Sequence, residues 1–245
     1  MASSGKTSAP PRGRPRLCDD DAILLAGLRA FAEHGYEAMS LHALNAGLGL
    51  SHGTINERFA SKEQFWYAAV DYGFRHLVAD ISGELQRRAV PGDDLSLLRG
   101  NIRAFLVALS RHPELVRLIN QEGVHPSERL DYILTRFVLP ALSESVEAMN
   151  RLADAKTLRR IPARTLLFLV VHGAAAPFTL QPLSERFDPV DGALDAITHV
   201  ELMTDVIISG LRRVVTAKGS TVAATARQPR VKRAVHEGAS RIRRG

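Results

Sequence analysis

The sequence predicts an all-α protein, and three observations lead to this prediction. Apolar residues recur at spacings of three and four rather than two, so the alternation typical of a strand is nearly absent. Glycine and proline fall between the apolar runs, as in Pro91-Gly92, where they end helices. With 245 residues and 45% hydrophobic content, the chain can bury one mid-sized or two small cores.

The first predicted helix spans about 20–34. Aspartates at 19–21 favour its start through the helix dipole, and apolar side chains recur along one face at helical spacing. Two short helices are expected within 40–59. A longer helix begins near Ser61 and buries the apolar residues between 65 and 85, so it should link the N-terminal part to the remainder of the chain.

Beyond Pro91-Gly92, helices are expected at 94–110, 113–121, 127–152, 162–176 and 191–216, enough for a second helical domain. Its most apolar window is shorter than the ~20 residues that cross a bilayer, so we interpret it as a buried helix. The chain has one cysteine and no apolar N-terminal stretch, which predicts a cytoplasmic protein without a membrane partner or an internal disulfide.

The segment 40–59, SLHALNAGLGLSHGTINERF, has the layout of a helix-turn-helix. Leucines recur at helical spacing in its first half, Gly49 breaks that helix, and Ser51 can cap a second one. The inner positions of the second helix are Ile55 and Phe59, which leaves its polar residues facing outward, where they suit a groove of DNA. Helix-turn-helix units also serve as plain scaffolds, so the pattern alone leaves both interpretations open.

The segment resembles the tetracycline-repressor (TetR) family of one-component transcription regulators. The matching residues run from about Ile23 to Val70 and include FAEHGYEAMS at 31–40, SHGT at 51–54 and SKE at 61–63. The resemblance implies an N-terminal DNA-binding domain of three helices, a C-terminal domain for effector binding and dimerisation, and contacts of Thr54 and Lys62 to the DNA backbone.

The chain departs from the family pattern in both short helices. Asn56, Glu57 and Arg58 stand where an aromatic residue followed by His or Tyr is usual, and Asn45 and Gly47 stand where alanines are usual. Asn56 and Arg58 can instead pair with adenine and guanine edges. The residues predicted to contact DNA are Arg12, Arg14, Arg16, Ser40, Ser51, His52, Gly53, Thr54, Asn56, Glu57, Arg58 and Lys62.

Positive charge is concentrated in the two ends of the chain. Residues 1–17 hold four basic and no acidic residues, 18–75 hold four basic and eight acidic ones, and 218–245 hold eight basic ones and Glu237. Such ends cannot bury enough apolar surface to become ordered, and they either solubilise the protein or attract phosphate. PRGRPR at 11–16 resembles an AT-hook core, whose arginines can enter a narrow minor groove.

Four segments are therefore expected: a disordered basic arm at 1–18, a helix-turn-helix DNA-binding domain at 19–66, a helical effector-binding and dimerisation domain at 67–217, and a disordered basic tail at 218–245. The last helix carries a heptad-like stripe with small residues. We interpret it as a dimer interface, although an internal core face would look similar. Its residues are Ala196, Val200, Met203, Ile207, Gly210 and Val214.

No catalytic motif or metal-ligand spacing stands out, so the sequence predicts neither an enzyme nor a cofactor. Within the C-terminal region, 112–132 is similar to one branch of the family. Polar candidates for an effector pocket are Arg117, Asn120, Gln121, Glu122 and Tyr132, together with His172. Solvated faces explain most of the polar set equally well, and a core position explains His172 better than a ligand contact.

These observations predict a homodimeric repressor that binds a palindromic operator in double-stranded DNA and releases it when a small molecule binds. Two rivals come from other classes. An architectural protein could coat DNA without sequence preference through its basic ends, and an enzyme could be built on the same helical scaffold. Little sequence preference would favour the first, and a cluster of acids or nucleophiles in a pocket would favour the second.

Overall fold

The computed structural model describes residues 19–87 and 92–212. In that part of the chain the structure is helical, and its only β contact is an isolated bridge between Leu158 and Arg212. The predicted all-α class is therefore confirmed. The predictions for Arg12, Arg14, Arg16, Val214 and the tail lie outside the described residues. None of the described helices is long and apolar enough to cross a membrane.

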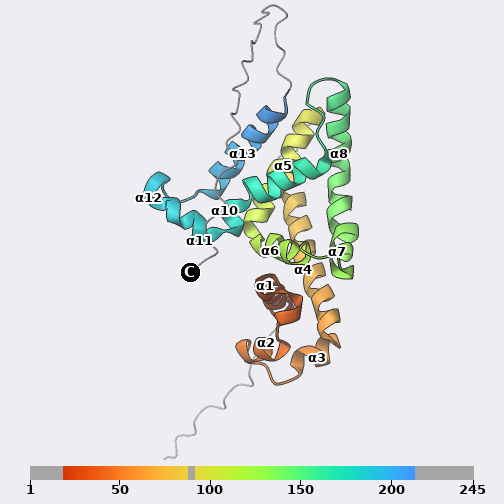
Figure 1. Ribbon diagram of the computed structural model, residues 1–245, viewed down its shortest axis with the longest axis vertical. Helices are drawn as coiled ribbons and strands as arrows, with labels where there is room; N and C mark the ends of the chain where they lie inside the picture. Colours follow the sequence, from red (N-terminus) through yellow and green to blue (C-terminus); the bar gives the residue numbers. More distant parts are fainter. Residues whose placement is uncertain (1–18, 88–91, 213–245) are drawn as a thin grey trace, which may run out of the picture. The chain divides into compact units, whose positions relative to one another are not determined.

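The N-terminal helices gather around the first half of a long helix (Figure 1). They are α1 (Asp20–Ala38), α2 (Leu41–Gly47), α3 (Thr54–Phe59) and α4 (Lys62–Arg87). Asp19 accepts a hydrogen bond from the backbone N–H of Asp21, and Ser40 accepts one from that of Ala43, so polar caps start α1 and α2. Gly35 has φ 75° inside α1, which bends the chain one residue after the predicted end of this helix.

The second short helix begins later than the sequence predicts. Gly53, with φ 89°, occupies the position before Thr54, a left-handed conformation that favours glycine. Ser51 does not cap a backbone N–H at this end; its hydroxyl lies 2.7 Å from the Thr54 hydroxyl and so holds the turn from the side.

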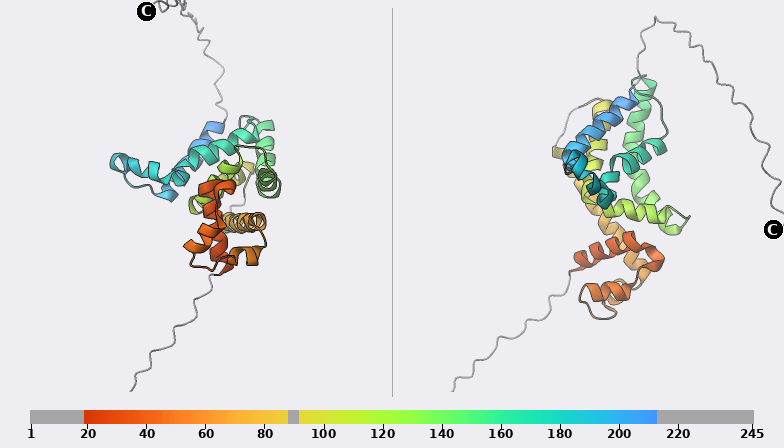
Figure 2. Two further views of the ribbon diagram at one scale, coloured as in Figure 1. Left: turned by 60° about the horizontal axis from the view of Figure 1, so that its bottom comes forward. Right: turned by 60° about the vertical axis from the view of Figure 1, so that its left-hand side comes forward.

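The C-terminal helices pack beside the second half of α4, with α13 alongside α5 (Figure 2). Their bounds are α5 (Asp94–Arg111), α6 (Pro113–Glu122), α7 (Glu128–Ile133), α8 (Leu139–Asp154), α9 (Ala163–Phe168) and α13 (Ala196–Leu211). Two π-helical segments, η1 (Leu134–Val138) and η2 (Leu169–Ala174), continue α7 into α8 and extend α9. The helices predicted at 127–152 and 162–176 thus exist with a widened turn inside each.

A run of short helices that the sequence does not predict precedes α13. They are α10 (Ala176–Thr179), α11 (Gln181–Ser184), the 3₁₀ segment η3 (Glu185–Phe187) and α12 (Asp188–Asp191). A proline occupies the first turn of each α-helix in this run, at Pro177, Pro182 and Pro189. Proline tolerates the first turn because the N–H it lacks would be unpaired there. In the sequence, the same prolines indicate breaks between helices.

Glycines let α1 and α4 approach each other closely. A Cβ added at Gly27 would lie 2.3 Å from Phe65 Cζ, and one at Gly73 would lie 2.5 Å from Leu28 Cδ2. The neighbouring aromatic and aliphatic side chains fill this space, and Phe65, Trp66 and Leu28 are fully buried. The core is therefore continuous from the N-terminal helices to α13.

Buried ion pairs join the helices of the C-terminal region. Arg103 on α5 donates to Glu84 on α4 at 3.2 Å and to Glu201 on α13 at 2.7 Å, and Arg87 and Arg111 also bind Glu84. Burial alone would raise the pKa of Glu84, but the hydrogen bonds from Arg103 and Arg111 and the charge of Arg87 hold that pKa below its ordinary value.

Candidate nucleic-acid interface

The exposed face of the α2–turn–α3 unit carries most of the polar residues that the sequence selects. Ser51, His52, Asn56 and Glu57 are exposed, while Ile55 is fully buried beneath them. One side of α3 thus packs inward and the other presents an amide and a carboxylate, with the His52 imidazole exposed in the turn before this helix. This is the arrangement expected of a helix that reads base edges.

Arg58 does not face outward as predicted. Its Nη1 lies 2.7 Å from Asp20 Oδ1, and only 20% of its side chain is exposed. The last turn of α3 lies beside the acidic start of α1, so the Asp20 carboxylate is within reach of the guanidinium. In this structure Arg58 joins two helices of the module, which corrects the expectation of an outward-facing guanidinium.

Three other predicted DNA contacts also support the module itself. Lys62 Nζ donates to the backbone carbonyl of Glu37 at 3.2 Å and lies 4.9 Å from the centre of the Tyr36 ring. The Thr54 hydroxyl lies 3.0 Å from the Ser51 carbonyl, to which it donates, and Ser40 caps α2. The Lys62 contact joins the start of α4 to the end of α1, and the other two stabilise the starts of α3 and α2.

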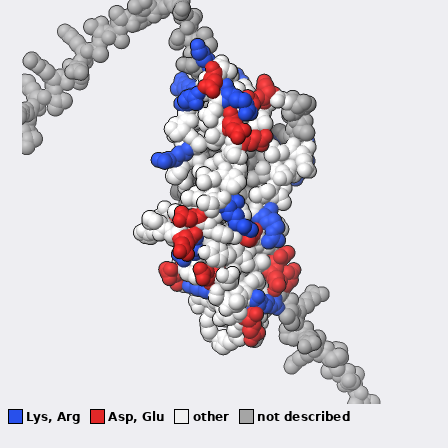
Figure 3. Space-filling view, turned by 90° about the vertical axis from the view of Figure 1, so that its right-hand side faces the viewer, with Lys and Arg blue, Asp and Glu red and all other residues white. Residues whose placement is uncertain are grey.

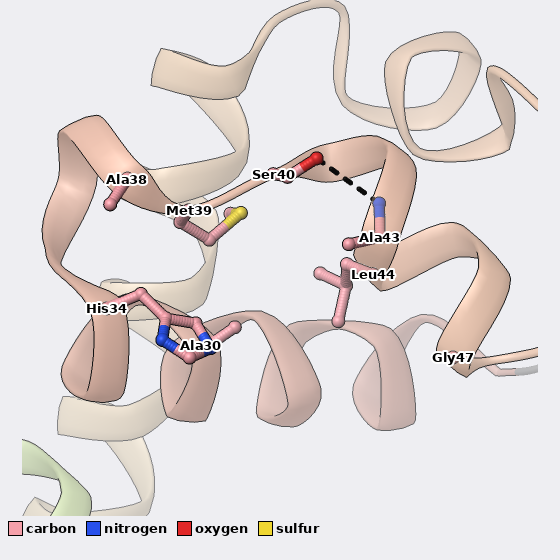
Figure 4. Close-up of a pocket in the computed structure, with 8 residues that line it drawn as sticks. All are labelled: Ala30, His34, Ala38, Met39, Ser40, Ala43, Leu44 and Gly47. Carbon is pink, nitrogen blue, oxygen red and sulfur yellow. Dashed lines mark hydrogen bonds between the residues drawn. The ribbon is translucent and has the colours of Figure 1, made fainter.

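An open hollow of about 450 Å³ lies where α2 meets α1 (Figure 4). Small and apolar side chains line most of it, and the close-up shows Ser40 turned toward the backbone nitrogen of Ala43. His34 is the titratable residue in this lining. The hollow therefore offers little polar chemistry, and it shows that α2 rests on α1 through few side chains.

His42 is a polar residue of this face that sequence analysis missed. It lies in the first turn of α2, and its Nε2 atom is 3.1 Å from Nε2 of His52 in the turn before α3. The two residues are ten positions apart, with no spacing that would mark them as a pair. Their contact follows from the way α2 folds back against the turn.

Asn45, a departure from the family's usual alanine, is buried on α2. It is 3% exposed, and its Oδ1 atom has no hydrogen-bond partner among the described residues. A buried unpaired amide oxygen is energetically costly. Asn45 therefore does not contact DNA from this position, and we have no physical account of its presence.

Acidic and basic side chains are intermixed on the face drawn in Figure 3, without a continuous basic patch. The predicted excess of acidic residues in the module is consistent with this view.

Three of the predicted effector-site residues lie together. Arg117, Asn120 and Gln121 of α6 line an open groove of about 1070 Å³ with Arg29 and Glu33 of α1. The segment 179–183 forms the other wall, and Arg117 Nε donates to the Thr179 carbonyl at 3.0 Å. The groove thus borders both the N-terminal module and the C-terminal helices.

The other effector candidates lie elsewhere. Glu122 is buried and accepts hydrogen bonds from Arg129. The Tyr132 hydroxyl donates to Asp71 Oδ1 at 2.6 Å, and burial together with this carboxylate raises the pKa of Tyr132 to about 12.

His172 is exposed beside Phe168, so the interpretation of His172 as a core histidine is wrong. His199, by contrast, is partly buried, and its Nε2 lies 2.8 Å from the Ala174 carbonyl, within hydrogen-bond distance. The apolar residues around His172 in the sequence predicted a buried helix, but the helix turns this side chain outward.

The predicted dimer stripe is mainly an inner face of α13. Val200 and Ile207 are 0% and 3% exposed and Met203 is partly buried, so among its described residues only Gly210 is open. Apolar residues on the opposite side of α13 are exposed instead, and more lie on α9, η2 and the run before α13. This second set comprises Phe168, Leu169, Leu180, Leu183, Phe187, Val190, Leu194, Ile197, Leu202 and Val206.

The fold and its exposed α3 define a helix-turn-helix protein with a helical C-terminal domain. Residues 23–69 match the family of bacterial regulatory proteins described as the tetR family. The match covers the helix-turn-helix module and not the C-terminal helices.

Two regulators are similar to parts of the chain. The chain is 40% identical over 60 residues to the HTH-type transcriptional repressor ComR of Escherichia coli (strain K12), covering 24% of this chain and 29% of ComR. It is 31% identical over 129 residues to the uncharacterized HTH-type transcriptional regulator Mb1581 of Mycobacterium bovis, covering 47% of this chain and 61% of that protein. The matches thus span less than two thirds of either relative.

A solved structure extends the likeness to the C-terminal helices. The TetR family transcriptional regulator PfmR from Thermus thermophilus superposes with a TM-score of 0.55 over 78% of this chain and 99% of PfmR, at 23% identity. At this identity the likeness concerns the fold alone.

Proposed function

We propose that this protein is a cytoplasmic, DNA-binding transcription regulator that recognises a specific operator. The observation that carries the proposal is the exposed polar side of α3 within a module that matches the tetR family. The E. coli relative is named as a repressor, which favours repression as the outcome of binding.

Asn56 is the residue we assign to base reading. It is exposed in the first turns of α3, and an asparagine amide can pair with both polar atoms of an adenine edge. Asn56→Ala should relax base preference at one position of each half-site and cost about 1–3 kcal/mol of binding free energy.

The test is selection of binding sites from a random DNA pool with the full-length chain. The wild type should recover one motif, and Asn56→Ala should lose a base of that motif. Asn150→Ala, at an exposed asparagine on α8, is the matched control and should select the wild-type motif. Selection of unrelated sequences by the wild type would indicate an architectural protein instead.

The basic arm is assigned to backbone attraction. Deleting residues 1–16 removes four positive charges ahead of a module with excess acidic residues. Each lost phosphate contact lowers the slope of log K against log salt by about 0.9, so operator binding should weaken and become less dependent on salt. An equal slope for both proteins would assign the arm to solubility.

A homodimer is the assembly we propose, with the outer face of α13 as its contact surface. A palindromic operator requires a two-fold axis, and Leu202 and Val206 are exposed on this helix, as are apolar residues of α9 and η2. Val206→Glu should place a charge in this surface and give monomers by light scattering. Val124→Glu changes an equally apolar, exposed residue near α6 and should leave the dimer intact.

The groove between α1 and α6 is our candidate for the effector site. A ligand that fills it touches Arg29 of the module and Asn120 and Gln121 of the C-terminal region, so it could change how α1 rests on α6. Small molecules that release operator DNA from the wild type should act more weakly on Gln121→Ala. Release with equal potency from both proteins would place the effector elsewhere.

A further inference from the structure

We propose that His42 and His52 form a binding site for a divalent transition-metal ion of the Zn²⁺, Ni²⁺ or Cu²⁺ type. Both side chains are exposed, and their Nε2 atoms lie 3.1 Å apart on two different elements of the module. Imidazole nitrogen is a preferred ligand of these ions. The site lies on the same face as Asn56 and Glu57, outside the groove described above.

The distance between the two nitrogens fits a shared ion. Nitrogens 3.1 Å apart that each lie ~2.05 Å from one ion subtend ~98° at that ion. This angle falls between the ~90° of square-planar or octahedral sites and the ~109° of tetrahedral ones.

In the structure one imidazole can donate a hydrogen bond from its Nε2 to Nε2 of the other, and the tautomer decides which ring is the donor. The ring centres are 4.2 Å apart. An ion bound by both nitrogens would replace the proton that lies between them.

The two elements that carry the histidines are held before any ion binds. Ser40 caps the helix of His42, and the Ser51–Thr54 hydroxyl contact flanks His52 in the turn. An ion bound by both rings would cross-link α2 to the turn that leads into α3. Less conformational freedom is then lost on binding than at two flexible residues.

The protein supplies two ligands at this point. Among residues 19–87 and 92–212, no group of three His, Cys, Asp or Glu side chains is placed to hold an ion. The remaining coordination positions would be filled by water in the isolated protein. Operator binding is part of the proposed function. In that complex a phosphate oxygen would replace one of these waters.

A bound ion would also change the electrostatics of the interface. Glu57 is exposed on the same face, and residues 18–75 hold eight acidic against four basic side chains. Two positive charges at this position would reduce the repulsion of phosphate. Metal binding should therefore strengthen DNA binding.

The first experiment measures metal alone, on the untagged full-length chain without DNA. Calorimetric titration with Zn²⁺ or Ni²⁺ at pH 7.5 should show one ion per chain bound by this pair. His42→Ala and His52→Ala should each weaken binding more than tenfold, since even the outer-shell partners of metal ligands contribute ~10–100-fold. His125→Ala, at an exposed histidine outside the module, should bind as the wild type does.

Acidification supplies a second readout. Metal binding should weaken between pH 7.5 and pH 5.5 in the wild type, because imidazole must be deprotonated to act as a ligand. Circular dichroism should give the same helix content for the variants, since both side chains are exposed. Equal metal affinity for the wild type and His42→Ala would overturn the inference.

The second experiment separates this inference from the proposed function. DNA binding by the wild type should persist in EDTA and become stronger on addition of Zn²⁺ or Ni²⁺, whereas His42→Ala should not respond to metal. If the protein binds DNA in EDTA but has no affinity for metal, the metal site is wrong and the proposed function stands. If it binds metal but not DNA, the metal site stands and the proposed function is wrong.

Discussion

The N-terminal module and the C-terminal helices are stabilised by contacts of different range. In the module, α2 and α3 have only seven and six residues, too short to be stable alone, and caps and Gly53 determine where they begin. In the C-terminal region, Arg103 on α5 binds Glu201 on α13, 98 residues later. Local contacts shape the first region, and contacts between distant segments shape the second.

This difference explains why the two regions were unequally predictable. A cap or a turn glycine acts on its immediate neighbours, so its effect can be recognised from a few consecutive residues. An ion pair between distant helices depends on how those helices meet. Three predictions test this contrast, and the largest effect is expected for the buried charges.

Arg103→Met should destabilise the C-terminal region strongly. The Arg103 side chain is 10% exposed, and its removal leaves Glu201 without this partner and Glu84 with Arg87 and Arg111 alone. Losing one member of a buried pair costs ~3–5 kcal/mol. We expect a loss of about 3 kcal/mol in the free energy of unfolding, measured with urea.

Arg99→Met is the matched control, because Arg99 and Asp205 join the same two helices at the surface. Their side chains are 44% and 56% exposed, so the loss should stay below about 1 kcal/mol. Equal losses for the two variants would contradict the assigned role of burial.

The stability that the Glu84 carboxylate contributes should depend on pH, because folding lowers its pKa. This contribution is fully present above the pKa of ~4.3 of an unfolded glutamate, and it is lost as the pH falls through the lower pKa of the folded state.

Gly27→Ala should destabilise the module by about 1–3 kcal/mol, the usual cost of overpacking a core. The new methyl group would lie 2.3 Å from the buried Phe65 ring. Gly47→Ala is the control within the same module, since no atom lies within 4 Å of its added Cβ. Alanine is the better helix former there and should add up to about 1 kcal/mol. The measurement is the melting temperature of each variant. If Gly27→Ala and Gly47→Ala shift it in the same direction, this account of α1–α4 packing is wrong.

His112→Gln should have the smallest effect, of about 1 kcal/mol, and it should depend on pH. His112 lies 3.1 Å from Asp80 and 3.6 Å from Glu114, so it joins α4 to α6. Hydrogen bonding to Glu114, opposed by burial and aided by Asp80, raises the pKa of His112. Its contribution is thus complete below the ~6.5 of an unfolded histidine and lost as the pH rises through the folded value.

The measurement is the difference in melting temperature between wild type and His112→Gln at pH 6.0 and pH 8.5. The difference should be larger at pH 6.0. His125→Gln changes an exposed histidine and should show no such dependence. A difference that is constant with pH would mean that His112 packs in its neutral form.

Sequence alone determined the all-α class, the helix-turn-helix and the resemblance of residues 23–69 to the tetR family. Periodicity, turn glycines and the order of short motifs suffice for these, because each arises from residues close together in the chain. The sequence also placed Arg117, Asn120 and Gln121 near one another, because they lie within two turns of a single helix.

Tertiary structure decided which faces are open and which side chains meet. The stripe of Val200 and Ile207 has the same spacing whether it packs on a partner or on its own core, and only the packing of α13 on α5 made it internal. Arg58 binds Asp20 because α3 meets α1, and His42 contacts His52 because α2 meets the turn before α3. A single sequence specifies periodicity along each helix but not the direction in which that helix faces, and that direction is determined by packing against the others.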